Sequence, residues 1–372
     1  MFAAQARRLN DSLFIWGWMS VVYSNTFLPR FMRDENLSRA EASQLLDWLL
    51  DGTATDAQIA ATLIALKRKG ETIEELAGLA EGMRARATRI NCHHERFIDT
   101  AGTGSSSAKT FNVSTAAAFV IAGAGLAVAK HGNRAASSKC GSADVLSSLG
   151  VNVSVDSAVS ESCLNDLGIC FMFAPLYHSA TARVAAIRRE LGVHTSFNLL
   201  GPLTNPAGAP RQIVGVWSRE LLEPMAKTLA LLGAERAWVV HGADGLDEIT
   251  LADRTFVAEA QNGEVRTFEV TPEEFGVPRS ELTALRCDDA ATSAAIIKSV
   301  LAGERRDTAR NLIIVNAAAA LTVGGLANDS PEGARLANES IDSGAALAKL
   351  DCRIVFSRLA EPRAFEAAVE RA

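Results

Sequence analysis

The chain has 372 residues, of which 48% are hydrophobic and 22% are charged, and its formal net charge is −6. This length allows two domains, and the composition is that of a globular protein. The negative balance gives no general attraction to nucleic acid or to an anionic membrane, so we predict neither as a partner. The six cysteines form no C-x-x-C pair and have no zinc spacing with histidine, which predicts reduced thiols and a cytoplasmic protein.

The first 32 residues contain an apolar stretch from Leu13 to Pro29 that follows two arginines, as in a signal peptide. Asp11 and the polar residues within the stretch argue against secretion, and the stretch is too short and broken to span a bilayer. We expect residues 1–32 to be a loosely attached extension or the product of a start codon assigned too far upstream, with Met32 as the alternative start.

A small helical domain is predicted over residues 33–95, joined by helices around 180–205. Ser38 and Glu41 have the spacing of a capping box, which predicts the start of a helix. A later Thr-x-x-Glu has the same spacing and predicts the start of another helix. Between them, DAQIAATLIALKRKG has a helical apolar stripe, a basic last turn and a terminal glycine, which predicts a further helix.

The rest of the chain, residues 96–372, alternates short apolar runs with amphipathic segments. This alternation favours a mostly parallel central sheet flanked by helices, an α/β domain. Asn262-Gly263 predicts a hairpin between TFVAEAQ and EVRTFEV. The five other candidate strands are RFIDTAG, LAVAKHG, ICFMFA, RQIVGVW and AWVVHGA. Late helices are predicted over about 288–302, 304–325 and 331–350.

Ligands of open α/β sheets bind at the carboxyl ends of the strands, so the loops there are the candidate sites. The first loop, GTGSSSAKTFNVST, combines glycines, hydroxyls and the start of a helix, whose free N–H groups favour an anion. It is neither a Walker loop nor a G-x-G-x-x-G motif. From its residues alone, a phosphate-binding loop and a solvated serine-rich turn both stay open.

Two further strand ends have charged loops. KHGNR offers Lys130 as a point charge and Arg134 as a planar fork, which suits a phosphorylated ligand, although a solvated basic turn stays open. DGLDE ends in Asp247 and Glu248, and magnesium commonly bridges a few carboxylates to substrate phosphates. Adjacent carboxylates are also common in surface turns, so their position at a strand end carries the prediction.

A fourth loop, PLYH, contains His178 and leads to a helix with Arg188. Aromatic and cationic groups together suit an aromatic or carboxylate-bearing ligand, although both residues could be ordinary surface residues. The four loops predict a pocket for a phosphorylated ligand and a metal beside a smaller acceptor. They do not define the reaction.

The chain resembles the anthranilate phosphoribosyltransferase family from about residue 33 to its C-terminus. The resemblance is carried by GTGSSSAKTFNVST, KHGNRAASSKCGSADVL, FAPLYHSATARVAAIRRELGVHTSFNLLGPLTNP and HGADGLDEIT, in family order. It implies transfer of the 5-phosphoribosyl group of phosphoribosyl pyrophosphate (PRPP) to the amine of anthranilate in tryptophan biosynthesis. It further implies Mg²⁺ as cofactor and a homodimer.

Carried over position by position, the resemblance implies three sets of site residues. Those expected at PRPP are Gly102, Ser105, Ser106, Thr110, Asn112, Val113, Ser114, Thr115, Lys130, His131, Gly132, Asn133, Arg134, Ala135, Ala136, Ser137, Ser138 and Ser142. Those expected at anthranilate are Gly102, Asn133 and Arg188, with His131 and His178 as neighbours. Those expected at the metal are Ser114, Asp247 and Glu248.

One departure from the family concerns Ser105 and Ser106, which stand where the family usually has glycine and aspartate. Because that aspartate lies near the pyrophosphate and its metal, we expect a changed metal dependence, with Lys109 adding attraction for the anion.

Two other functions are weighed against the transferase. Thymidine-type nucleoside phosphorylases have the same architecture but should read lysine-histidine-serine at Lys130-His131-Gly132. A non-catalytic relative that binds nucleic acid should have a basic surface and eroded motifs, whereas this chain is acidic and keeps KHGNR and DE.

Overall fold

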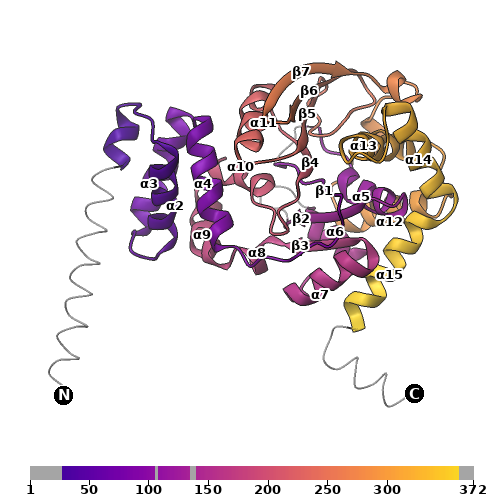
Figure 1. The fold of residues 1–372 in the computed structure, drawn as a ribbon, viewed down its shortest axis with the longest axis horizontal. Coiled ribbons are helices and arrows are strands. Elements are labelled where there is room, and N and C mark those ends of the chain that lie inside the picture. Colours follow the sequence, from indigo (N-terminus) through magenta and orange to yellow (C-terminus); the bar gives the residue numbers. More distant parts are fainter. Residues whose placement is uncertain (1–26, 105–107, 135–139, 360–372) are drawn as a thin grey trace, which may run out of the picture. The chain divides into compact units, whose positions relative to one another are not determined.

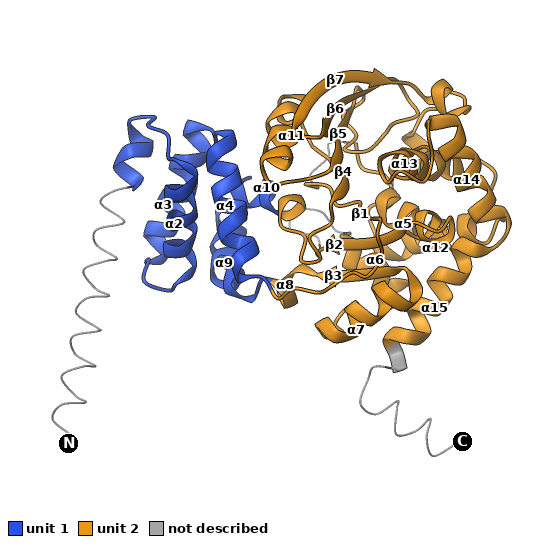
Figure 2. Cartoon of the chain, viewed as in Figure 1, with its two compact units in different colours: residues 1–87, 178–200 blue, residues 88–177, 201–372 orange. Residues whose placement is uncertain are grey.

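The computed structural model describes residues 27–104, 108–134 and 140–359. The chain forms two compact units, which Figure 2 colours separately. Unit 1 comprises Met1–Ala87 and His178–Leu200, and unit 2 comprises Thr88–Tyr177 and Gly201–Ala372. Residues 88–95, which we expected in the helical domain, belong to unit 2, because the Thr88 amide donates to the Tyr177 carbonyl at 2.9 Å.

Unit 1 is helical, and its helices begin where the sequence predicts. The hydroxyls of Ser38, Thr55 and Thr72 each cap a helix in a complete capping box. Gly70, with φ of 86°, ends the second of these helices, in a conformation that a side chain rarely adopts. The helices are α2 (Arg39–Leu50), α3 (Asp56–Lys69), α4 (Ile73–Arg86) and α9 (Ala182–Leu191), and α10 (Ser196–Leu203) runs on into unit 2.

The end of the expected N-terminal extension differs from the prediction. Residues 27–32 are helical, and the side chains of Phe27 and Phe31 are buried. These residues are therefore part of the packed structure, although we placed the boundary after residue 32. The apolar pattern that resembles a signal peptide is, at its C-terminal end, a pattern of core residues.

Unit 2 contains a seven-stranded sheet of order β3-β2-β1-β4-β5-β6-β7, seen in Figure 1. The first five strands pair in parallel, and β6 and β7 are antiparallel additions at one edge. Asn262 and Gly263 both have positive φ, 53° and 82°, as a type I′ hairpin turn requires. The strands are β1 (Phe97–Asp99), β2 (Ala127–Gly132), β3 (Ile169–Phe173), β4 (Arg211–Gly215), β5 (Arg236–Gly242), β6 (Thr255–Gln261) and β7 (Glu264–Val270).

All seven predicted strands and the mostly parallel sheet are confirmed. Alternate side chains of the sheet enter two separate cores: Ile98 and Val128 lie in the larger, and Phe97 and Ala129 lie in the smaller. The helices of unit 2 are α5 (Val113–Gly123), α6 (Ser142–Ser148), α7 (Ser157–Ser162), α8 (Ala174–Tyr177), α11 (Leu222–Leu231), α12 (Ala290–Leu301), α13 (Thr308–Val323), α14 (Ser330–Asp342) and α15 (Ala345–Leu359).

The prediction of one late helix over 331–350 is wrong. The segment forms two helices, α14 and α15, separated at Gly344, whose φ of 77° ends the first. Both halves have helical apolar spacing, so the pattern hid the break. Among the described residues, none of the helices is both long and apolar enough to span a bilayer.

Candidate functional site

The loop after β1 is tied to the end of β4. The Thr103 amide and hydroxyl both donate to the Gly215 carbonyl, at 2.8 and 3.0 Å. A Cβ at Gly102 would lie 3.2 Å from the same oxygen, so glycine lets the two strand ends approach closely. Ser105 and Ser106, with the departure expected there, lie outside the described residues.

The same loop leads into α5, whose first turn offers backbone N–H groups. Asn112 precedes the helix and is held by Ser293: its amide donates to Ser293 Oγ at 3.0 Å, and Ser293 Oγ donates to Asn112 Oδ1 at 3.2 Å. The Ser114 amide donates to Glu248 Oε1 at 3.2 Å. A carboxylate therefore occupies the positive end of α5, where an anion is favoured.

The acidic loop after β5 is shaped by Asp244, which accepts from the Leu246 amide at 3.2 Å and from Thr250 Oγ1 at 2.8 Å. Asp247 and Glu248 follow in the same loop. Burial and the negative charge of Asp247 raise the pKa of Glu248 to about 8. Two adjacent carboxylates thus share a site in which the anionic form of one of them is disfavoured.

Lys130 lies in the C-terminal half of β2 (Ala127–Gly132), and its side chain bonds to residues on both sides of the loop between β1 and α5. Its side chain is buried, and Nζ donates to the Thr100 carbonyl at 2.7 Å, to Thr100 Oγ1 at 3.1 Å and to Ser114 Oγ at 3.3 Å. Burial lowers the pKa of Lys130, whereas the charges of Asp99 and Glu248 act in the opposite direction. The lysine is thus held in place before any ligand is bound.

Asp99, which the sequence analysis did not select, stabilises this arrangement through hydrogen bonds. It is fully buried, and it accepts from the His131 amide at 3.2 Å and from Asn205 Nδ2 at 2.7 Å. Burial raises its pKa to about 6, against the opposing effect of Lys130. The available signal was an aspartate inside the apolar strand FID, since buried carboxylates need partners.

The rest of the KHGNR loop packs tightly. A Cβ at Gly132 would lie 2.6 Å from Phe171 Cε2, too close for a real contact, so a serine does not fit there without movement of its neighbours. Arg134 forms an ion pair with Asp144 at 2.9 Å and stacks over Phe173 at 5.8 Å, with its side chain 55% exposed. Ala135, Ala136, Ser137 and Ser138 lie outside the described residues.

The other residues expected at PRPP differ in which of their groups a ligand could reach. Val113 and Thr115 are buried in the core, so only their backbone groups can serve a ligand. Ser142 Oγ donates to the Asn133 carbonyl at 3.3 Å, and Thr110 Oγ1 donates to the Phe111 carbonyl at 3.1 Å. These hydroxyls therefore shape the loops in this structure.

Two expected anthranilate residues, Arg188 and His178, belong to unit 1. Arg188 is half-buried, and its guanidinium donates to Asn198 Oδ1 at 3.0 Å and lies 5.4 Å from the ring centre of Phe197. Burial lowers its pKa. Asn198 also accepts from the Thr195 amide at 2.9 Å, so the arginine is positioned by a residue that is itself fixed.

The structure thus gathers Ser114, Lys130 and Glu248 into one hydrogen-bonded group at the carboxyl ends of the strands. Within the described ranges there is no cluster of three or more His, Cys, Asp or Glu side chains suited to a metal. The protein offers two carboxylates and a hydroxyl, which are hard oxygen donors, and Mg²⁺ usually completes such a set with substrate phosphates and water.

Comparisons with known proteins define the class. Residues 94–347 match the glycosyl transferase family, a/b domain, and residues 26–87 match its helical bundle domain. An anthranilate phosphoribosyltransferase of Moorella thermoacetica is 48% identical over 88% of this chain and 97% of its own length, and one of Anaeromyxobacter dehalogenans is 50% identical over 87% and 95%.

Solved structures agree. The anthranilate phosphoribosyltransferase of Thermus thermophilus superposes with a TM-score of 0.84 at 40% identity, covering 89% of this chain and 99% of its own. The Saccharomyces cerevisiae enzyme in complex with PRPP and Mg gives 0.83 at 28% identity, covering 90% and 98%. The chain belongs to the anthranilate phosphoribosyltransferase family, as its motifs predicted, and the predicted fold class is confirmed.

Proposed function

We propose that this chain transfers the 5-phosphoribosyl group of PRPP to the amine of anthranilate, releasing pyrophosphate, in tryptophan biosynthesis. The observation that carries the proposal is the group formed by Lys130, Ser114 and Glu248 at the carboxyl ends of the strands, where Lys130 Nζ donates to Ser114 Oγ at 3.3 Å and the Ser114 amide donates to Glu248 at 3.2 Å. It combines a cation, a helix N-terminus and a carboxylate, which suits an anionic ligand with a bridging metal.

The chemistry of the transfer fits these groups. Departure of pyrophosphate leaves positive charge on the ribose ring and negative charge on the leaving group, so fixed positive groups beside the leaving group accelerate the step. Lys130 and the first turn of α5 supply them. The aromatic amine is already a nucleophile, so the chain has to orient it in line with the ribose and needs no strong general base.

The donor set fits Mg²⁺. The raised pKa of Glu248 means that its charge is poorly compensated in this structure, and a divalent cation near Ser114, Asp247 and Glu248 would supply the compensation. When bound there, the metal would neutralise charge on the pyrophosphate.

The remaining roles follow the resemblance. We assign the loop residues named above to PRPP, and Arg188 to the carboxylate of anthranilate, since its planar fork matches a carboxylate and Asn198 already holds one nitrogen at 3.0 Å. The resemblance adds Gly102, Asn133, His131 and His178 as candidates for binding anthranilate. The homodimer and the cytoplasmic location stay predictions.

The test is the loss of anthranilate fluorescence on addition of PRPP and Mg²⁺. Wild type should turn over, and Arg188→Ala should raise the KM for anthranilate by about 10-fold to 100-fold, because a hydrogen-bonded charge pair contributes about 1.5–3 kcal/mol. Arg189→Ala, the exposed neighbour on α9, is the matched control and should change little. Absence of turnover by wild type would refute the proposal.

The same preparation separates the two other functions. A nucleoside phosphorylase would release thymine from thymidine with phosphate, and a nucleic-acid-binding relative would shift an oligonucleotide in a binding assay. We expect no phosphorolysis, since a Cβ at Gly132 would lie 2.6 Å from Phe171 Cε2 and the serine of the phosphorylase motif fits only if its neighbours move. We expect no oligonucleotide shift, since the net charge of the chain is −6.

A further inference from the structure

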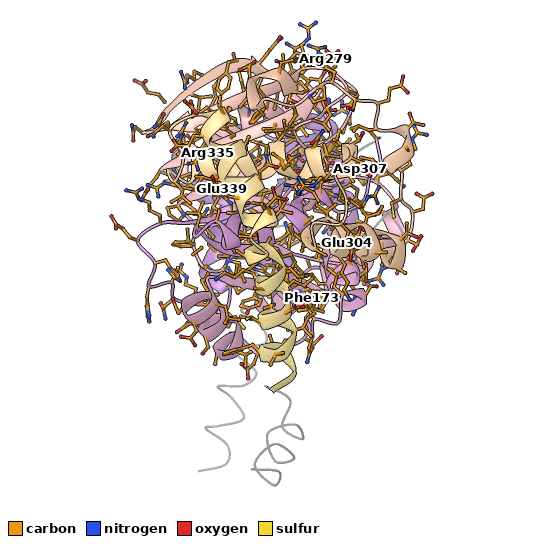
Figure 3. All side chains as sticks on the ribbon, turned by 90° about the vertical axis from the view of Figure 1, so that its right-hand side faces the viewer. Phe173, Arg279, Glu304, Asp307, Arg335 and Glu339 are labelled. Carbon is orange, nitrogen blue, oxygen red and sulfur yellow. The ribbon has the colours of Figure 1, made fainter. Side chains whose placement is uncertain are left out.

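Asn316 is a polar residue in the middle of a largely apolar, buried helix. It lies on α13, in the stretch NLIIVNAAAALTV, and 4% of the residue is exposed. The helix begins after Asp307, labelled in Figure 3, whose side chain accepts from the Ala309 amide at 3.1 Å. A buried amide side chain is costly unless its polar groups have partners, so the bonds of Asn316 account for its place in the core.

Asn316 binds the backbone of Ile249, the residue that follows Glu248 in the acidic loop. The Ile249 amide donates to Asn316 Oδ1 at 2.9 Å, and Asn316 Nδ2 donates to the Ile249 carbonyl at 2.9 Å. Nδ2 also donates to the Leu312 carbonyl, one turn earlier in α13, at 2.9 Å. The oxygen and both N–H groups of the side chain are therefore engaged.

This contact fixes the acidic loop to a helix. Asp244 binds Leu246 and Thr250 within the loop, and such bonds give the loop its internal shape. They do not fix where the loop lies against the rest of unit 2, whereas Asn316 does. Ile249 is buried, with 1% of the residue exposed, so water cannot readily replace Asn316 at its amide and carbonyl.

The two carboxylates that we assign to the metal lie between two such restraints. The Asp247 backbone packs against Gly215, where a Cβ would lie 2.7 Å from the Asp247 carbonyl carbon. On the other side, Asn316 holds Ile249 at 2.9 Å. A backbone held at both places leaves Glu248 little freedom, and its Oε1 meets the Ser114 amide at 3.2 Å.

We propose that Asn316 is a positioning residue for the candidate metal site. By holding the Ile249 backbone, it keeps Asp247 and Glu248 in the geometry in which they bind Mg²⁺ together with PRPP. This inference rests on the proposed function, from which it takes the metal ligands. Asn316 has no polar group left for a ligand of its own, so it acts through the loop alone.

The first experiment measures metal binding without turnover. Mn²⁺ is titrated into the full chain with PRPP and without anthranilate, and free Mn²⁺ is followed by electron paramagnetic resonance. Asn316→Leu branches at the same carbon and removes all three hydrogen bonds, so the Kd for Mn²⁺ should rise by about 10-fold to 100-fold, as for other groups that orient metal ligands. In steady-state assays the KM for PRPP and the Mg²⁺ requirement should rise, and the KM for anthranilate should stay unchanged.

Thr322→Val is the matched control on the same helix. Thr322 is buried, with 5% exposed, and Oγ1 donates to the Ala318 carbonyl at 2.9 Å and to the Asp329 carbonyl at 3.1 Å. This end of α13 lies where β5 begins, since Arg236 donates to the Thr322 carbonyl at 2.9 Å. The variant therefore loses buried hydrogen bonds away from the carboxyl ends of the strands, and it should keep the Mn²⁺ affinity of wild type even if its Tm falls.

The second experiment tests the contact without reference to the function. In the full chain without ligands, hydrogen exchange at the Ile249 amide should be slow in wild type and in Thr322→Val, and about 10-fold faster in Asn316→Leu, because the bond that protects it is removed. Rapid exchange of this amide in wild type would overturn the proposal, even if Asn316→Leu does not fold.

The two experiments together separate this proposal from the function on which it rests. Equal Mn²⁺ affinity in wild type and Asn316→Leu, or an equal loss of affinity in Thr322→Val, would refute the positioning role alone. Slow exchange at Ile249 in a wild type that binds no Mn²⁺ with PRPP would refute the proposed function, and the positioning role with it.

Discussion

The Gly215→Ala substitution should distinguish an effect on the geometry of the candidate site from a general loss of stability. It ends β4, and a Cβ built there would lie 2.7 Å from the carbonyl carbon of Asp247 and closer still to its oxygen. Ordinary contacts of a Cβ begin near 3.4 Å. Gly215 does not have positive φ, so alanine meets a steric obstacle and no conformational one.

The Gly215→Ala variant therefore has to displace the backbone at Asp247 by about 1 Å or more, and Glu248 follows in the chain. Displacements of this size at a site that positions reactants cost about 100-fold in rate. We expect kcat/KM for PRPP to fall by about that factor and the Mg²⁺ requirement to rise. Stability should fall by about 1–3 kcal/mol, as for other overpacked positions.

Gly333→Ala is the control, because it also creates an overlap with a backbone carbonyl, a smaller one, elsewhere in unit 2. A Cβ there would lie 2.6 Å from the Ala318 carbonyl oxygen, between α14 and α13. It should lower the Tm as Gly215→Ala does and leave the KM for PRPP and the Mg²⁺ requirement unchanged. If the two variants lose activity in equal proportion, the clash at Asp247 has no specific role and the reasoning is refuted.

Two further predictions concern residues that the sequence analysis did not assign. Phe31→Ala should lower the free energy of unfolding by about 3–5 kcal/mol, as for other buried phenylalanines, whereas the neighbouring Met32→Ala, at a residue that is 62% exposed, should change it little in urea titrations. Asp99 has its pKa raised from 3.8 to about 6, so the folded state holds this proton more tightly, and the stabilisation it gives below pH 4 is lost as the pH rises through 6. Compared with Asp99→Asn, wild type should lose about 2 kcal/mol between pH 4 and pH 7, and an equal pH dependence of the two proteins would contradict the burial of the carboxylate.

The predictable part of the fold rests on short-range signals. The capping boxes at Ser38 and Thr72 and the hairpin turn at Asn262-Gly263 depend on residues within four positions of each other, and all three form as predicted. The break at Gly344 was missed because apolar spacing continues on both sides, and a single glycine is tolerated in many helices.

The site could be predicted as a set of loops but not as a set of contacts. Lys130 and Glu248 could be selected because charged residues follow apolar strands there. Asp99 could not, because its partner Asn205 lies 106 positions away and no local pattern predicts such a pair.

The contact between Glu248 and the first turn of α5 predicts that Mg²⁺ assists the binding of PRPP. The Ser114 amide, one of the donors that a pyrophosphate oxygen would use, donates to Glu248 at 3.2 Å. An incoming pyrophosphate therefore meets both a donor that is already engaged and a carboxylate of like charge. A divalent cation between the carboxylates and the pyrophosphate reverses the sign of that interaction, so the affinity for PRPP should depend on Mg²⁺ more steeply in wild type than in Glu248→Ala. Isothermal titration of PRPP at several Mg²⁺ concentrations measures this difference, and equal Mg²⁺ dependence in the two proteins would show that Glu248 has no part in it.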